Sequence, residues 1–113
     1  MSEFEDVGAV VDLPDGEMLG VELTTRQPVC VYNVGGTIGA VGNLCTHALF
    51  HLSEGVLHGD GTIECIWHGA RFDCRTGAAK RHPAEWPVPV YDVRVVNGRI
   101  LVGPEVAVEE TRS

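Results

Sequence analysis

The stretch that runs from Cys45-Thr46-His47 to Cys65-Ile66-Trp67-His68 decides the fold of this chain. It places one cysteine and one histidine close together in each of two short segments, with 17 residues between the segments. Two such segments brought face to face offer two thiolates and two imidazoles, a complete set of four ligands. Proteins use this set either for a structural zinc ion or for a [2Fe–2S] cluster in which two histidines replace two cysteines on one iron.

The residues around these four ligands resemble the Rieske family of [2Fe–2S] proteins. The resemblance extends over nearly the whole chain and rests on Cys45-Thr46-His47, Leu52-Ser53-Glu54-Gly55, Cys65-Ile66-Trp67-His68-Gly69-Ala70-Arg71-Phe72-Asp73 and Thr76-Gly77. It implies one Rieske-type [2Fe–2S] cluster held by Cys45, His47, Cys65 and His68. In length and acidity the chain is most similar to the small Rieske ferredoxins of bacterial aromatic-ring dioxygenases.

Two hairpin signals flank the ligand segments. Val29–Val34 and Thr37–Asn43 lie on either side of Gly35-Gly36, and Val90–Val96 and Arg99–Val102 lie on either side of Asn97-Gly98. Both dipeptides favour two-residue hairpin turns. In the second hairpin apolar and polar residues alternate, which predicts a half-buried strand with Tyr91, Val93 and Val95 on its inner face.

The rest of the chain also predicts strands. Val7–Val11 and Met18–Leu23 are short apolar segments separated by the turn sequence Leu13-Pro14-Asp15-Gly16. Between the hairpins we expect short strands near Gly55–His58, Thr62–Glu64 and Arg71–Asp73. Fourteen glycines and six prolines leave little room for a helix of ten residues or more.

The expected fold is therefore all-β, a single Rieske domain over residues 1–113. We expect an antiparallel sandwich or barrel-like base subdomain at about residues 1–43 and 90–104. A cluster-binding subdomain at about residues 44–89 is inserted into it and carries the two ligand loops. The resemblance implies the same arrangement.

Charge excludes several kinds of partner. Sixteen acidic residues against eight basic ones give a net charge of −8, which argues against nucleic acid and anionic membranes. Residues 1–20 lack a basic start and an uninterrupted apolar run, so we expect a cytoplasmic protein. Four of the eight basic residues fall just after the second cysteine-histidine pair and suggest a less negative rim near the metal: Arg71, Arg75, Lys80 and Arg81.

The resemblance also indicates a low reduction potential. High-potential respiratory Rieske proteins have a serine and a tyrosine whose hydroxyls bond to sulfur, at positions that match Ala70 and Phe72 here. They also have a disulfide between cysteines that match Phe50 and Trp67. With neither feature, we expect a potential near the bottom of the Rieske range, and loops kept rigid by packing of Phe50, Leu52, Trp67, Phe72 and Trp86.

Two further cysteines need a separate account. Cys30 lies inside the apolar run Val29–Tyr32 and is most simply a small buried hydrophobic residue. Cys74 could be a third thiolate for the metal, although the four ligands are complete without it.

The functional expectation is a one-electron carrier with no catalytic site of its own. It would accept electrons from a flavin-dependent reductase and donate them to a terminal aromatic-ring dioxygenase. Three alternatives stay open: a Rieske small subunit of another oxidoreductase, such as a nitrite reductase, a structural zinc module, and a fold that has lost its metal.

Overall fold

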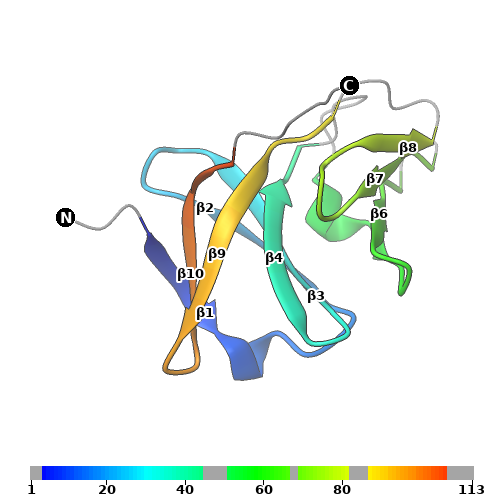
Figure 1. Ribbon diagram of the computed structural model, residues 1–113. Helices are drawn as coiled ribbons and strands as arrows, with labels where there is room; N and C mark the ends of the chain where they lie inside the picture. The colour runs from blue at the N-terminus through cyan, green and yellow to red at the C-terminus, as the bar shows by residue number, and fades with distance from the viewer. Residues whose placement is uncertain (1–3, 45–50, 67–68, 82–86, 107–113) are drawn as a thin grey trace.

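The computed structural model describes residues 4–44, 51–66, 69–81 and 87–106, and these residues form two antiparallel sheets (Figure 1). The larger sheet has the order β1-β10-β9-β4-β3-β2, with strands β1 (Glu5–Ala9), β2 (Met18–Glu22), β3 (Pro28–Val34), β4 (Thr37–Gly42), β9 (Val90–Val96) and β10 (Arg99–Glu105). The smaller sheet has the order β5-β6-β7-β8, with β5 (Val56–Leu57), β6 (Thr62–Glu64), β7 (Arg71–Asp73) and β8 (Ala79–Arg81). The only helical elements in these described ranges are two 3₁₀ turns, η1 (Val10–Asp12) and η2 (Leu52–Glu54). The all-β prediction is confirmed.

Both predicted hairpins are present, and their turns have the expected backbone. Gly35 and Gly36 have φ values of 60° and 93°, and Asn97 and Gly98 have values of 52° and 76°. Positive φ at both central residues gives the turn a twist that matches the flanking strands. The first turn therefore sets the register of β3 on β4, and the second sets that of β9 on β10.

The predicted alternation in β9 holds only near its start. Tyr91 is buried and Val93 is half-buried, but Val95 is 50% exposed. Pairing explains the difference, because β4 pairs with β9 only through Ala40↔Tyr91 and Val41↔Val90. The distal half of β9 extends beyond β4, so Val95 has no neighbouring strand on that side to bury it.

The larger sheet curls so that its two edge strands approach each other. Glu5 of β1 accepts hydrogen bonds from Thr24, just after β2: 3.1 Å from the backbone N–H and 2.8 Å from Oγ1. Glu5 thus closes a gap between strands that do not pair directly. The curled sheet encloses one hydrophobic cluster, formed by Leu13, Leu23, Val29, Val31, Ala40, Tyr91, Ile100 and Val102.

A second hydrophobic cluster joins the two sheets. Cys30, Tyr32 and Val41 of the larger sheet pack with Ile63 and Phe72 of the smaller one. The smaller sheet lies to one side of β3 and β4 (Figure 1). Its strands fall within residues 56–81, whereas those of the larger sheet lie before residue 43 and after residue 89. The division into two subdomains remains an interpretation of this arrangement.

Along the described ranges, no helix is long and apolar enough to cross a membrane.

Candidate metal centre

The second predicted ligand loop begins where β6 ends. Cys65 follows Glu64 directly, is 1% exposed, and donates its backbone N–H to the carbonyl oxygen of Ala70 at 2.7 Å. This bond closes the turn that joins β6 to β7. Cys65 is therefore a buried thiol at the base of a short closed loop, while its predicted partner His68 lies outside the described residues.

The base of the first predicted ligand loop is equally well defined. Leu44 and His51 form an antiparallel bridge, and the N–H of Leu52 donates to the carbonyl oxygen of Asn43 at 2.6 Å. These contacts bring together the two ends of the segment 45–50. Cys45 and His47 belong to that segment and lie outside the described residues.

Buried side chains support both loop bases. Leu52 of η2 and Phe72 of β7 are 0% and 1% exposed, and both belong to the same hydrophobic cluster as Cys65. Their predicted role in packing is confirmed to that extent. The other three aromatic candidates lie outside the described residues: Phe50, Trp67 and Trp86.

The two remaining cysteines lie in this cluster as well. Cys30 is fully buried, as predicted, and Cys74 is 2% exposed. Burial raises the pKa of the Cys30 thiol to about 12, and Cys74 nearby adds to the effect. The pKa of Cys74 is also raised to about 12, mainly by burial. Without metal, burial therefore favours the protonated form of both thiols, and the predicted ligand Cys65 is equally buried.

A charged network borders the second loop. Nε2 of His58 lies 2.7 Å from Oε1 of Glu64 and 2.9 Å from Nη2 of Arg71. A proton on Nε2 lets His58 donate to Glu64, and without it this nitrogen accepts from Arg71. The hydrogen bond from His58, followed by the charge of Arg71, holds the pKa of Glu64 below its ordinary value. Glu64 is thus an ionised carboxylate directly beside Cys65.

Sequence reasoning missed this network, because His58 had no predicted role. The signal lay in the expected pairing of the two strands, since Glu64 stands opposite Arg71 in the β6–β7 ladder. Arg71 also lies 3.8 Å from Asp60, so its charge is shared among acidic neighbours. Of the other basic residues predicted for the rim, Arg75 and Lys80 have exposed side chains, and the side chain of Arg81 lies outside the described part of the chain.

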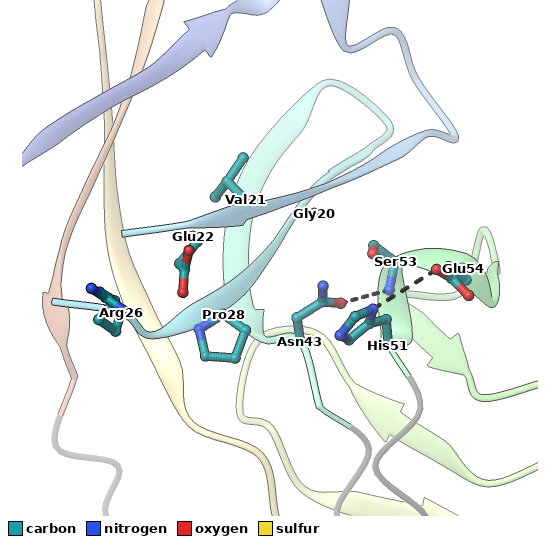
Figure 2. Close-up of a pocket in the computed structure, with 9 residues that line it drawn as sticks. All are labelled: Gly20, Val21, Glu22, Arg26, Pro28, Asn43, His51, Ser53 and Glu54. Carbon is teal, nitrogen blue, oxygen red and sulfur yellow. Dashed lines mark hydrogen bonds and ion pairs between the residues drawn. The ribbon is translucent and has the colours of Figure 1, made fainter. Parts of the chain in front are cut away.

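A groove of about 530 Å³ lies beside the base of the first loop (Figure 2). It runs from the turn after β2 to η2 and is lined by Gly20, Val21, Glu22, Arg26, Pro28, Asn43, His51, Ser53 and Glu54. Figure 2 shows Asn43, His51 and Ser53 at one end of the groove, close to where the chain enters and leaves the first loop.

Of the predicted ligands, the described residues include only Cys65, whose sulfur is a donor type that holds iron in [2Fe–2S] clusters. No group of three or more possible metal ligands occurs within ranges 4–44, 51–66, 69–81 and 87–106, and three of the four predicted ligands fall outside them. The fourth, Cys65, is buried at the base of the second loop.

Comparison with known proteins identifies the family. Residues 3–92 match the model of the Rieske [2Fe-2S] domain. The 3-phenylpropionate/cinnamic acid dioxygenase ferredoxin subunit of Escherichia coli (strain K12) is 39% identical over 93 residues, which are 82% of this chain and 86% of that protein. The anthranilate 1,2-dioxygenase ferredoxin subunit of Burkholderia cepacia is 34% identical and covers 90% of this chain and 93% of its own length.

Solved structures agree. The ferredoxin of carbazole 1,9a-dioxygenase from Nocardioides aromaticivorans IC177 superposes with a TM-score of 0.86 at 38% identity, covering 91% of this chain and 99% of that one. A chain from the complex of reduced oxygenase and oxidized ferredoxin in carbazole 1,9a-dioxygenase reaches 0.88 at 34% identity, with 96% and 100% covered.

A nitrite reductase relative is similar too, but less so. The structure described as a putative NADH-dependent nitrite reductase small subunit from Mycobacterium tuberculosis has a TM-score of 0.80 at 26% identity, covering 96% of this chain and 99% of that one. Both measures are lower than for the dioxygenase ferredoxins. The chain therefore belongs to the Rieske [2Fe–2S] family, whose cofactor is a [2Fe–2S] cluster, and is similar within it to the ferredoxins, which carry electrons and are not themselves catalysts.

Proposed function

We propose that Cys45, His47, Cys65 and His68 hold the [2Fe–2S] cluster of this protein. The support comes from the family match, from the spacing of the two cysteine-histidine pairs, and from the buried position of Cys65 at a closed loop. A cluster of this kind supplies a centre that gains and loses one electron at a time. Two thiolates give one iron strong negative charge, and two neutral imidazoles leave the other iron less electron-rich.

We further propose that the protein shuttles single electrons between two partners in the cytoplasm. It accepts them from a flavin-dependent reductase and donates them to a terminal aromatic-ring dioxygenase. The observation that carries this proposal is the 39% identity to a protein named as a dioxygenase ferredoxin subunit. A similar structure comes from a complex of an oxygenase with its ferredoxin, which supports an oxygenase as the acceptor. The net charge of −8 disfavours nucleic acid and anionic membranes as partners.

Electron paramagnetic resonance of the dithionite-reduced protein tests the cluster directly. We expect the anisotropic signal of a [2Fe–2S] centre with mixed nitrogen and sulfur ligation, from red-brown protein that contains two irons and two acid-labile sulfides. Colourless protein that contains zinc would contradict the proposal, and so would protein that contains neither iron nor zinc.

The partners need a separate test. The purified ferredoxin is added to a flavin-dependent reductase, NADH or NADPH and a terminal aromatic dioxygenase, and product formation is followed. We expect turnover that depends on the ferredoxin, with two electrons delivered one at a time per reaction. Stable copurification with a nitrite reductase large chain, without support of any dioxygenase, would favour the second candidate, for which the nitrite reductase relative provides the specific observation.

A further inference from the structure

We propose that Asn43 is a positioning residue for electron transfer, which fixes the first ligand loop against the sheet. The inference rests on the proposed ligand roles of Cys45 and His47. Asn43 stands directly after β4 and two residues before Cys45, and it is 5% exposed. Because Asn43 is buried, water competes little for its hydrogen bonds.

Three hydrogen bonds converge on Asn43, and each has a different partner. Its backbone N–H donates to the carbonyl oxygen of Pro28 in β3 at 3.1 Å. Its backbone oxygen accepts from the N–H of Leu52 at 2.6 Å, and its side-chain Oδ1 accepts from the N–H of Ser53 at 2.8 Å (Figure 2). One residue at the start of the loop therefore binds the sheet on one side and the far end of the loop on the other.

The side chain of Asn43 also fills a space that the sheet leaves open for it. A Cβ atom at Gly20 of β2 would lie 2.9 Å from Nδ2 of Asn43 and 2.7 Å from Oγ of Ser53. Any larger residue at Gly20 would displace one of these groups. The glycine thus permits the close approach of Asn43 and Ser53 to β2, which Figure 2 shows from the groove side.

The same contacts lead to the second ligand loop through η2. Leu52, bonded to Asn43, is fully buried in the cluster that contains Cys65. Gly55, directly after η2, lies so close to the carbonyl oxygen of Glu64 that a Cβ atom there would collide with it. The bases of the two loops are therefore packed on one short turn, and Asn43 anchors that turn.

Positions 50 and 67 are Phe50 and Trp67, so no disulfide can join the two loops there, and the hydrogen bonds at the loop bases have to do this work. Residues that orient metal ligands from behind typically change metal affinity or activity by about 10-fold to 100-fold when they are replaced. Asn43 bonds to Leu52 and Ser53 and not to a proposed ligand, so we expect an effect at the lower end of this range. Its loss should change the cluster environment and not only the stability of the fold.

Asn43→Ala tests the proposal, with Asn33→Ala as a matched control. Asn33 is also buried, donates from Nδ2 to the carbonyl oxygen of Leu13 at 2.8 Å, and accepts the N–H of Gly36 at 2.9 Å, but it belongs to the opposite end of β3. We expect both variants to have a lower Tm. Only Asn43→Ala should shift and broaden the electron paramagnetic resonance signal and lose iron to a chelator about 10-fold faster.

Asn43→Asp separates the acceptor from the rest of the side chain. It keeps an oxygen for the N–H of Ser53, so the line shape and the rate of iron loss should return close to wild type. Wild-type line shape and iron loss in Asn43→Ala would overturn the proposal. So would equal effects in Asn33→Ala, or an Asn43→Asp protein that behaves like Asn43→Ala.

Gly20→Ala provides a second route if Asn43→Ala does not fold. It removes no polar group but presses on the amide of Asn43, so it should broaden the signal and speed iron loss in the same direction. A wild-type signal in folded Gly20→Ala protein would contradict the proposal. Failure of the proposed function would be visible separately, in wild-type protein that shows no nitrogen-ligated [2Fe–2S] signal.

Discussion

Arg99 of β10 binds Asp6 of β1 through two hydrogen bonds of 2.9 Å, from Nε to Oδ2 and from Nη2 to Oδ1. The two residues are 93 positions apart in the sequence. Their bidentate pair links β1 and β10, the first and last strands of the chain, which are neighbours in the larger sheet. Such a two-point pair between planar groups is more specific than a single contact between charges.

Because of this pair, we expect part of the thermal stability of the protein to depend on pH. The hydrogen bonds from Arg99 lower the pKa of Asp6 below its ordinary value of 3.8. Because the pKa of Asp6 is lower in the folded state, the ion pair stabilises the fold fully above pH 3.8. This stabilisation is lost as the pH falls through the pKa of Asp6 in the folded protein. We expect Asp6→Asn to lower Tm at pH 7, and the difference from wild type to shrink below pH 3.8. A difference in Tm that stays constant from pH 7 to pH 3 would contradict this assignment.

Two buried cysteines of the same cluster should respond differently to replacement. Cys65→Ala is expected to abolish cluster assembly and to destabilise the fold, since ligand bonds contribute to the stability of small metal-binding domains. Cys74→Ala is the matched control, because Cys74 is equally buried but has no proposed ligand role. It should keep the visible spectrum and two irons, and lose about 1 kcal/mol of unfolding free energy. A full visible spectrum in Cys65→Ala would remove Cys65 from the ligand set.

The reduction potential should rise when hydroxyl groups are introduced near the second loop. Ala70 and Phe72 are 0% and 1% exposed, and neither side chain can donate a hydrogen bond. We expect a wild-type midpoint near the bottom of the Rieske range of roughly −150 to +300 mV. Ala70→Ser should raise it by roughly 40 to 60 mV, if the hydroxyl favours the reduced state by about 1 to 1.4 kcal/mol.

A redox titration followed by the visible spectrum measures both values. Ala40→Ser is a control for the added hydroxyl, because Ala40 is also buried but belongs to the cluster inside the larger sheet, which does not contain Cys65. It should leave the midpoint unchanged. A wild-type midpoint above about +100 mV would contradict the low-potential prediction.

Tyr32 connects the larger sheet to the segment after β7. Its hydroxyl donates to the carbonyl oxygen of Cys74 at 3.2 Å, in the buried cluster between the sheets. Tyr32→Phe leaves that buried carbonyl without this donor and should cost about 1 to 2 kcal/mol of unfolding free energy. Chemical denaturation measures the loss. The midpoint potential and resonance signal should not change, so a changed signal would place Tyr32 among the residues that position the ligands.

Much of the fold follows from local sequence. Gly35-Gly36 and Asn97-Gly98 specify two hairpins because few other residues adopt positive φ at two successive positions. β8 was not predicted, because Ala79-Lys80-Arg81 is short, polar and without alternation; it forms by pairing with β7. The first strand also ends earlier than the apolar segment Val7–Val11 indicates, since Val10 turns to donate its N–H to Gly98.

The sequence likewise predicts one part of the metal centre and not another. The spacing of Cys45, His47, Cys65 and His68 predicts four ligands and a cofactor, because few donor sets combine two thiols and two imidazoles. The sequence does not indicate that Asn43 joins β3 to η2, or that His58 bridges Glu64 and Arg71. Those contacts depend on how distant segments pack; the pairing of Glu64 with Arg71 gives a partial signal for the second, and no residue type or spacing indicates the first.

The burial of Cys30 and Cys74 has a consequence for maturation of the cofactor. Iron and sulfide delivered to this protein meet a chain with four cysteine thiols, although the proposed centre uses only two of them. Both thiols are enclosed in the core between the two sheets, and burial raises their pKa, so iron would have to displace a proton that is held more firmly than in an exposed cysteine. Once the core has formed, this disfavours incorporation of metal at Cys30 and Cys74.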